Sequence, residues 1–429
     1  MSTVVIEGGD VLTPEFDVVR ADVLVDADSG DVLDVGEDLD AEEVLDATDG
    51  LVIPGLVNAH THVSMTLLRG YADDKPLETW LREDVWPVEA ELTPGDVRVG
   101  AELGIVEMIR SGATTFSDMY FHVPEIAAAV EESGIRAVLG HTAITVGKDE
   151  ADARADVRES LDVAIELDGA ADGRITTTFQ PHSLTTVEEP YLEEFVPKAR
   201  EAGLPIHFHA NETVNEVEPI VDERGMRPLE YADDLGLLTE RDFFAHGVHL
   251  DDAEIDLLSE RGTGVIHCPA SNMKLASGMA PVQRLLEAGV TVGIGTDGAA
   301  SNNDLDVFGE LRDAAMIGKL AAGDASAVGA ESAVRMATAG GADALGITSG
   351  RIEPGANADL AVINLEAAHL TPAHDLVSHL AYAVRGSDVR HTICDGQVLM
   401  RDREVLTLHE PRVREEAERR AAELVKRAA

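Results

Sequence analysis

The chain of 429 residues has two cysteines, no long apolar run and few basic residues. Cys268 and Cys394 cannot build a disulfide framework and neither belongs to a Cys-x-x-Cys pair, so we expect a reducing compartment. No stretch reaches the roughly 18 consecutive apolar residues of a membrane helix, and the first residues lack a basic segment followed by an apolar one. These absences predict a cytoplasmic protein with neither an export signal nor a membrane span.

Basic residues are outnumbered by acidic ones along the whole chain. There are 33 Lys and Arg residues against 81 Asp and Glu residues, which gives a formal net charge of -48. Such a charge repels nucleic acid phosphates and anionic membranes, so we expect neither nucleic acid nor membrane as a partner. The composition resembles that of proteins from salt-accumulating halophiles. On this interpretation, the fold weakens at low salt, where repulsion between the carboxylates is unscreened.

Both ends of the chain carry short strand patterns. The first 53 residues alternate in polarity between Gly-Asp turns, and similar segments return at 358–363 and 392–399. We therefore expect a small composite β-sandwich domain built from residues 1–54 and 350–405. The last segment, 406–429, mixes arginines with alanines and glutamates, which predicts an exposed helix. We expect this helix to pack on the barrel that residues 55–349 form, or against another subunit of a homo-oligomer.

Between these ends, short apolar runs alternate with amphipathic stretches such as 96–110 and 252–261. This rhythm is typical of α/β proteins with a parallel sheet, and eight candidate strands predict a closed (β/α)8 TIM-like barrel over residues 55–349. The candidate strands are 56–62, 113–118, 137–141, 175–182, 205–209, 243–246, 264–267 and 291–297. The ionisable residues that end them are His62, Asp118, His141, His182, His209, His246, His267 and Asp297. Because the carboxyl ends of barrel strands form one mouth, we expect the active site there.

The pair His60 and His62 is typical of a metal site. On a strand, residues i and i+2 project to the same side with Cα atoms roughly 6–7 Å apart, so one Zn²⁺ can bind both imidazoles. The alternative is a surface strand with two incidental histidines, which the row of ionisable strand ends disfavours. His209 is a natural third ligand and Asp297 a natural fourth, although His207 shares the face of His209 and could replace it.

Two further residues are placed to act beside this metal. Glu212 follows His209 by three residues and could exchange protons with water and substrate as a general base, or it could simply be a carboxylate at a helix start. His246 could polarise the substrate or the attacking water, or it could be a hydrogen-bonded core histidine.

Several signatures of other chemistry are absent. No lysine ends the run 175–179, where a carbamylated ligand would be needed to hold a second metal, so we expect one Zn²⁺ per subunit. The H-x-E and P-C-x-x-C signature of cytidine deaminases is missing. Gly293 and Gly295 are followed by Thr296 and Asp297 at a strand end, not by the helix start of a phosphate-binding loop.

The motifs around these residues resemble the amidohydrolase superfamily. The residues that carry this resemblance are 54–62, His209 with Glu212, His246 and 296–298. Further segments are similar to the 5-methylthioadenosine/S-adenosylhomocysteine deaminases, namely 65–70, 80–81, 118–120, 268–275 and 298–303. The resemblance runs nearly end to end, as far as residues 355–360.

The resemblance implies a role for each matching position. His60, His62, His209 and Asp297 match the zinc ligands, with Asp297 also in the reaction, Glu212 matches the proton shuttle and His246 a catalytic histidine. The positions that match substrate contacts are Glu89 for the ribose diol, His182 for purine or ribose, Trp80 for the 5′ substituent, and Ser301. Where the family often has arginine after the third strand, this chain has His141, and the arginine of the following loop could be Arg154 or Arg158. Histidine cannot reproduce a bidentate contact to a carboxylate, so preference for the homocysteine-bearing substrate stays open.

The resemblance implies a small-molecule substrate and its hydrolytic deamination, the candidates being 5′-substituted adenosines such as 5′-methylthioadenosine, S-adenosylhomocysteine and 5′-deoxyadenosine, and adenosine itself. One alternative is an aminohydrolase or chlorohydrolase of guanine, cytosine or a triazine, whose substrates offer no ribose diol to Glu89. A more remote alternative is a non-catalytic binding protein on the same fold.

Overall fold

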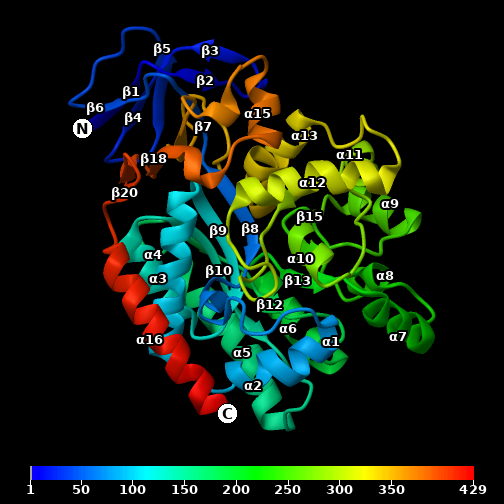
Figure 1. Ribbon diagram of the computed structural model, residues 1–429. Helices are drawn as coiled ribbons and strands as arrows, with labels where there is room; N and C mark the ends of the chain where they lie inside the picture. The colour runs from blue at the N-terminus through cyan, green and yellow to red at the C-terminus, as the bar shows by residue number, and fades with distance from the viewer. Residues whose placement is uncertain (1) are drawn as a thin grey trace.

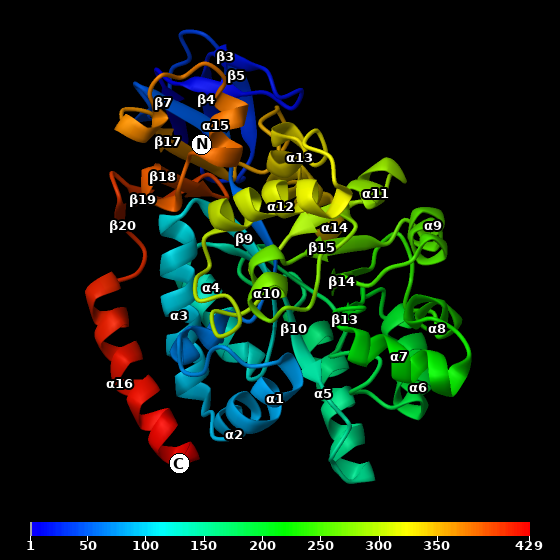
Figure 2. The ribbon, with the colours of Figure 1, turned by 45° about the vertical axis from the view of Figure 1, so that its right-hand side comes forward.

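The computed structural model describes residues 2–429 and consists of a barrel, two β-sheets at one end of it and a long C-terminal helix (Figure 1). Strands from both ends of the chain lie together in one of these sheets (Figure 1). Helix α16 (Glu410–Ala428) runs along the outside of the barrel in both ribbon views, and it packs mainly on α3 (Pro94–Arg110) (Figure 2). Within residues 2–429, no helix is both long and apolar enough to cross a membrane.

The barrel is made of parallel strands whose side chains are almost all buried. Its strands are β8 (Leu56–Thr61), β9 (Ala113–Tyr120), β10 (Arg136–Ala143), β11 (Ile175–Thr177), β12 (Gln180–Pro181), β13 (His207–Ala210), β14 (Phe243–His246), β15 (Gly264–His267) and β16 (Val292–Ile294). One run joins β11, β10, β9 and β8, and a second joins β13 to β16. Bridges from Phe179 to Ile206 and from Ser183 to His209 connect the runs on one side. On the other side, the Asp297 N–H donates to the His60 carbonyl at 3.0 Å, so the barrel closes as predicted.

Most of the predicted strands differ in their bounds from the observed ones, and two of these differences bear on the site. The fourth is interrupted, because Thr178 and Phe179 separate β11 from β12. The eighth ends at Ile294, three residues earlier than predicted, and Asp297 has a left-handed backbone with φ of 58°. Strand geometry requires a negative φ, so Asp297 belongs to the loop and not to the strand.

Amphipathic helices surround the barrel. The helices between the strands are α4 (Val123–Ser133), α5 (Glu150–Leu167), α6 (Glu189–Glu201), α7 (Val214–Arg224), α8 (Pro228–Asp234), α9 (Asp252–Arg261), α10 (Pro269–Lys274), α11 (Val282–Glu287), α12 (Val307–Ala322), α13 (Ala330–Arg335) and α14 (Gly341–Leu345). The two stretches predicted at 96–110 and 252–261 are α3 and α9. Each begins with a capping box, Thr93 with Asp96 and Asp251 with Glu254, which satisfies amide groups that the first turn leaves free.

The chain ends share a seven-stranded sheet in the order β20-β19-β18-β17-β7-β2-β3. Strand β17 (Leu360–Asn364) pairs antiparallel with β7 (Gly50–Pro54), which leads directly into β8 of the barrel. A second sheet has the order β5-β4-β1-β6. Its strands are β1 (Thr3–Glu7), β4 (Asp22–Asp26), β5 (Val32–Gly36) and β6 (Glu43–Asp46). The other strands of the first sheet are β2 (Asp10–Leu12), β3 (Val18–Arg20), β18 (Val389–Cys394), β19 (Gln397–Arg401) and β20 (Glu404–Val405). Apolar residues of both sheets form one buried cluster, whereas the domain boundaries themselves stay a prediction.

Candidate metal centre and active site

The predicted ligands come together at the carboxyl mouth of the barrel. Ring nitrogens of His60, His62 and His209 lie within 4.8 Å of one another, and so do ligand atoms of His60, His246 and Asp297. Asp297 Oδ1 is 3.1 Å from His62 Nε2 and 3.4 Å from His60 Nε2. The two groups share His60, and Asp297 also contacts His62, so the four predicted ligands adjoin one another.

Each ligand histidine is oriented by a contact at its Nδ1. His62 Nδ1 is 2.6 Å from the Met119 carbonyl, and His209 Nδ1 is 2.7 Å from the His182 carbonyl. A carbonyl only accepts, so both Nδ1 atoms carry the proton and both Nε2 atoms present a lone pair. Nδ1 contacts of this kind typically hold metal-binding histidines in place.

His60 is oriented by a second histidine. His207 Nδ1 is 3.2 Å from the Phe243 carbonyl and therefore donates, which leaves His207 Nε2 to accept from His60 Nδ1 at 2.9 Å. His60 Nε2 is thereby left with a lone pair, and it is buried with no hydrogen-bond partner among residues 2–429. The structure thus places His209 in the cluster and His207 behind His60, whereas the ligand role of His209 stays a prediction.

Asp297 is fixed at both ends of its carboxylate. Hydroxyl groups of Ser271 and Ser301 donate to Oδ2 at 2.7 and 2.6 Å, so Oδ1 faces the histidines. Burial acts to raise the pKa of the Asp297 carboxyl, but the adjacent imidazoles of His60 and His62 hold this pKa well below its usual range. Three nitrogens, a charged oxygen and the unpartnered His60 Nε2 suit a divalent metal, and this donor set is one that Zn²⁺ uses.

Glu212 and His246 face each other beside this cluster. His246 Nε2 lies 3.7 Å from Glu212 Oε2, and burial raises the pKa of the Glu212 carboxyl. The backbones of Asn211 and His246 are left-handed, with φ of 56° and 79°. Non-glycine residues adopt this conformation at a cost that is characteristic of functional sites.

The predicted substrate contacts Glu89, His182 and Trp80 are mostly buried. Burial raises the pKa of Glu89 to about 7, and the Tyr120 hydroxyl donates to Glu89 Oε1 at 2.8 Å. The His182 ring centroid lies 4.7 Å from that of His209, and burial lowers the pKa of His182 to about 3. Trp80, in α1 (Leu77–Trp80), donates from Nε1 to the Ala72 carbonyl at 3.0 Å. Glu89 ends α2 (Trp86–Glu89), in the segment that follows η1 (Val63–Leu68).

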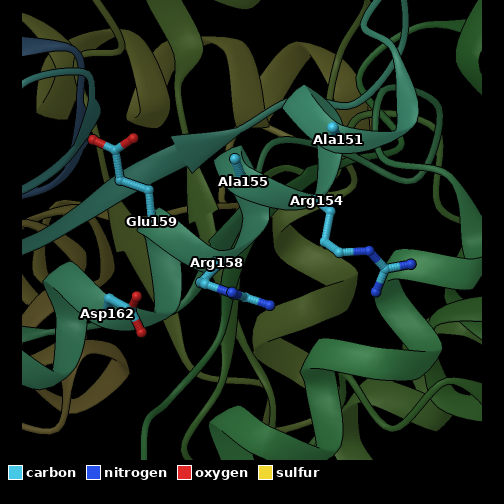
Figure 3. A pocket seen from close by; sticks show the side chains of 6 residues that line it. All are labelled: Ala151, Arg154, Ala155, Arg158, Glu159 and Asp162. Carbon is cyan, nitrogen blue, oxygen red and sulfur yellow. The ribbon is translucent and has the colours of Figure 1, made fainter.

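The remaining predicted contacts have other partners. His141 Nε2 is 3.1 Å from Asp156 Oδ1, and the Arg154 guanidinium pairs with Glu194 of α6. Arg154 and Arg158 line a shallow pocket on α5 together with Glu159, and both arginine side chains extend to the same side (Figure 3). The roles of His141 and of either arginine toward a substrate therefore stay predictions.

The sequence assigned no role to several residues of the site. They are Asp118, Tyr120, Ser271, Asn272 and Ser277, and His207 was considered only as an alternative ligand. Asp118 Oδ1 accepts from the Val63 N–H at 2.6 Å, just after the histidine pair, and burial raises the pKa of Asp118 to about 7. Its place at a strand end was the available signal. The serines and Asn272 had no periodicity to mark them.

Comparison with known proteins gives consistent results. A model of the amidohydrolase family matches residues 51–399. The chain is 72% identical to a 5-methylthioadenosine/S-adenosylhomocysteine deaminase of Haloarcula marismortui, with 100% of both chains covered. It is 49% identical to a 5′-deoxyadenosine deaminase of Methanothermobacter thermautotrophicus, with 88% of each covered. The crystal structure of an adenosine deaminase from Xanthomonas campestris with bound zinc has a TM-score of 0.93 at 37% identity, with 99% of each chain covered.

Proposed function

The chain belongs to the amidohydrolase family, and we propose on that premise that it is a zinc-dependent enzyme that deaminates 5′-substituted adenosines. The products are the corresponding inosine and ammonia. The observation that carries this proposal is the grouping of four ligand side chains with Glu212 and His246 at one barrel mouth. The relatives named as deaminases of such adenosines support the choice of substrate.

His60, His62, His209 and Asp297 would hold one Zn²⁺ per subunit. When bound, zinc would act as a Lewis acid that makes water a better nucleophile near neutral pH. A second metal is not proposed, because no lysine ends the run 175–179.

Glu212 transfers the protons of the reaction in this proposal. It accepts a proton from the water that attacks C6 of the purine and delivers one to ring N1, so that the ring rather than the exocyclic amine takes up the electron pair. Its buried position and raised pKa suit a group that must both take and return a proton near neutral pH. His246 presents Nε2 beside Glu212, where it would polarise the attacking water. The second proton of that water passes from the new C6 hydroxyl to the amine, which leaves as ammonia while the C6 carbonyl forms.

Glu89 selects a substrate with a ribose. One carboxylate can accept hydrogen bonds from two adjacent hydroxyl groups, and the Tyr120 hydroxyl fixes its orientation. His182 and Trp80 would contact the nucleoside, and Ser301 would act through Asp297, to which its hydroxyl is bonded. Guanine, cytosine and triazines lack the diol, so Glu89 with Tyr120 favours a nucleoside over the alternative substrates.

A substrate panel tests the proposal. The purified protein in molar potassium chloride is given methylthioadenosine, S-adenosylhomocysteine, 5′-deoxyadenosine, adenosine, guanine and cytosine, and ultraviolet absorbance and ammonia release are followed. We expect turnover of at least one 5′-substituted adenosine that a chelator abolishes and zinc restores. Activity confined to guanine or cytosine would favour the alternative enzyme, and bound zinc without turnover of any compound would favour a binding protein. We further propose that the protein is cytoplasmic and that it forms a homo-oligomer. Light scattering of the purified protein measures its oligomeric state.

A further inference from the structure

One short segment of the chain contacts three different groups of the site. In the segment 271–277, which spans the end of α10 and the turn after it, Ser271 Oγ donates to Asp297 Oδ2 at 2.7 Å. Asn272 Oδ1 lies 3.0 Å from His246 Nδ1. The Ser277 hydroxyl donates to Glu212 Oε1 at 3.2 Å. These three side chains are 0%, 1% and 7% exposed, so water does not compete for their contacts.

We propose that residues 271–277 act as a positioning segment. Its side chains Ser271, Asn272 and Ser277 hold Asp297, His246 and Glu212, respectively, in the orientations that the reaction needs. This inference rests on the proposed function, since it assigns the segment a part in that reaction. It gives each of the three residues a separate task.

Ser271 fixes the metal ligand. With Oδ2 of Asp297 occupied by its hydroxyl together with that of Ser301, Oδ1 faces His60 and His62. Loss of such an outer contact typically weakens metal binding about 10- to 100-fold.

Asn272 sets the tautomer of His246. Its Oδ1 accepts from Nδ1–H, so the other ring nitrogen, Nε2, is the one that faces Glu212 at 3.7 Å. Without this acceptor, the imidazole could rotate or exchange tautomers, and Nε2 would no longer be held against the reacting atoms.

Ser277 holds the proton-transferring group. Its hydroxyl binds Oε1 of Glu212, which leaves Oε2 toward His246. The Glu212 backbone is fixed independently, because its N–H donates to Glu216 Oε2 at 2.9 Å. The side chain therefore depends on Ser277 for its direction.

The positioning segment is itself anchored at several points. The Ala270 N–H donates to Glu310 Oε2 at 3.1 Å, Lys274 Nζ lies 2.6 Å from Asp73 Oδ1, and His249 Nε2 donates to the Ser277 carbonyl at 2.7 Å. These contacts join the segment, together with Ala270 just before it, to α12, to the loop after η1 and to the loop after β14. A segment tied to three neighbours can keep its own three side chains aligned, as preorganised catalysis requires.

Alanine variants at Ser271, Asn272 and Ser277 test the proposal, with Met273→Ala as the control. Met273 lies in α10 with Ser271 and Asn272, but it is 40% exposed. Zinc affinity is measured by competition with a chelator, and kcat and KM are measured on the best nucleoside of the panel. We expect Ser271→Ala to lose zinc affinity about 10- to 100-fold. Asn272→Ala and Ser277→Ala should retain zinc and lose about 10- to 100-fold in kcat at nearly unchanged KM. Met273→Ala should match the parent protein.

Conservative variants separate positioning from a general effect on folding. Ser277→Thr keeps a hydroxyl and Asn272→Asp keeps an oxygen opposite His246, so both should recover kcat relative to the alanine variants. Unchanged kcat in Asn272→Ala and Ser277→Ala, or equal loss in the conservative and alanine variants, would overturn the proposal. If the parent protein turns over no adenosine, the proposed function fails instead, and the zinc affinity of Ser271→Ala still decides the part of the inference that concerns Asp297.

Discussion

His207 lies behind His60, with its Nε2 2.9 Å from His60 Nδ1, so one imidazole fixes the protonation of another. A second hydrogen bond follows in this series, because the Phe243 carbonyl accepts from His207 Nδ1. A backbone carbonyl in the barrel wall thereby determines which nitrogen of His60 is free to bind a metal. The two histidines are 147 residues apart in the chain, and adjacent barrel strands do not explain the contact, because β8 and β13 belong to different runs.

Replacing His207 should therefore weaken zinc binding without removing a ligand. His207→Phe keeps a ring of similar size but offers no acceptor to His60 Nδ1, and we expect about a 10- to 100-fold loss of zinc affinity. Competition with a chelator measures this affinity. His391→Phe is a matched control, because His391 is also buried but bonds Asp46 in the sheets. Equal affinity in both variants would exclude the assigned role of His207.

Glu212→Gln should lower kcat by about 10²- to 10⁴-fold or more and leave zinc bound, because an amide cannot transfer a proton. Zinc content and steady-state kinetics are measured on the same preparation. Glu218→Gln, an exposed position of α7, should retain full activity. A near-normal rate in Glu212→Gln would contradict the proton-transfer role.

Glu89→Gln should raise KM for nucleosides at least about tenfold, since the loss of a charge-assisted hydrogen bond of about 1.5–3 kcal/mol weakens binding of the diol. Tyr120→Phe should act in the same direction and more weakly, because it removes only the hydroxyl that orients Glu89. The exposed Glu91 provides the control Glu91→Gln. Unchanged kinetics on adenosines in Glu89→Gln would favour a substrate without ribose.

Arg136→Met should destabilise the fold by about 3–5 kcal/mol at pH 7, because it leaves the buried carboxylate of Asp359 without its partner at 2.9 Å. This pair joins β10 of the barrel to the sheet that contains β17. Burial acts to raise the pKa of Asp359, but Arg136 holds it below its usual value. In the parent protein, the stabilisation is thus present above about pH 4 and is lost as the pH falls through the lowered pKa. In the variant, hydrogen bonds from Ser349 and the Asp395 N–H still oppose burial, but the pKa of Asp359 rises above its value in the parent protein, so the deficit in stability should shrink as the pH falls.

Urea unfolding in concentrated potassium chloride at several pH values measures this difference. Arg261→Met breaks an exposed pair with Asp233 and should cost no more than about 1 kcal/mol. Equal destabilisation by both variants would show that burial of the Arg136 pair has no special effect.

The melting temperature should rise between about 0.1 and 1 M potassium chloride, because the Debye length falls from about 10 to about 3 Å and the net charge of -48 is screened. Differential scanning fluorimetry measures the change. Sucrose stabilises by exclusion from the surface and does not screen charge, so it should not replace the salt. A melting temperature independent of salt would contradict the interpretation of the acidic composition.

The sequence by itself determined those features that follow from local periodicity. Alternation along a strand places His60 and His62 on one side, and the repeated strand-helix pattern predicts the barrel, whose parallel strands bring His209, His246 and Asp297 to the same mouth. These are consequences of backbone geometry that hold wherever such a pattern occurs.

Only the tertiary structure decided how each side chain is held there. The sequence could not distinguish His207 from His209, because both lie on the same face of β13, and the distinction depends on contacts to β14 and to His60. Likewise, the sequence assigns no partner to Ser271, Asn272 or Ser277, although the first two lie in the family-like segment 268–275, because their partners lie 26 to 65 residues away. Hydrogen bonds between distant residues depend on the closed barrel and the packed loops. The tautomers of the histidines and the orientations of the Asp297 and Glu212 carboxylates are therefore properties of the folded chain and cannot be read from the sequence pattern.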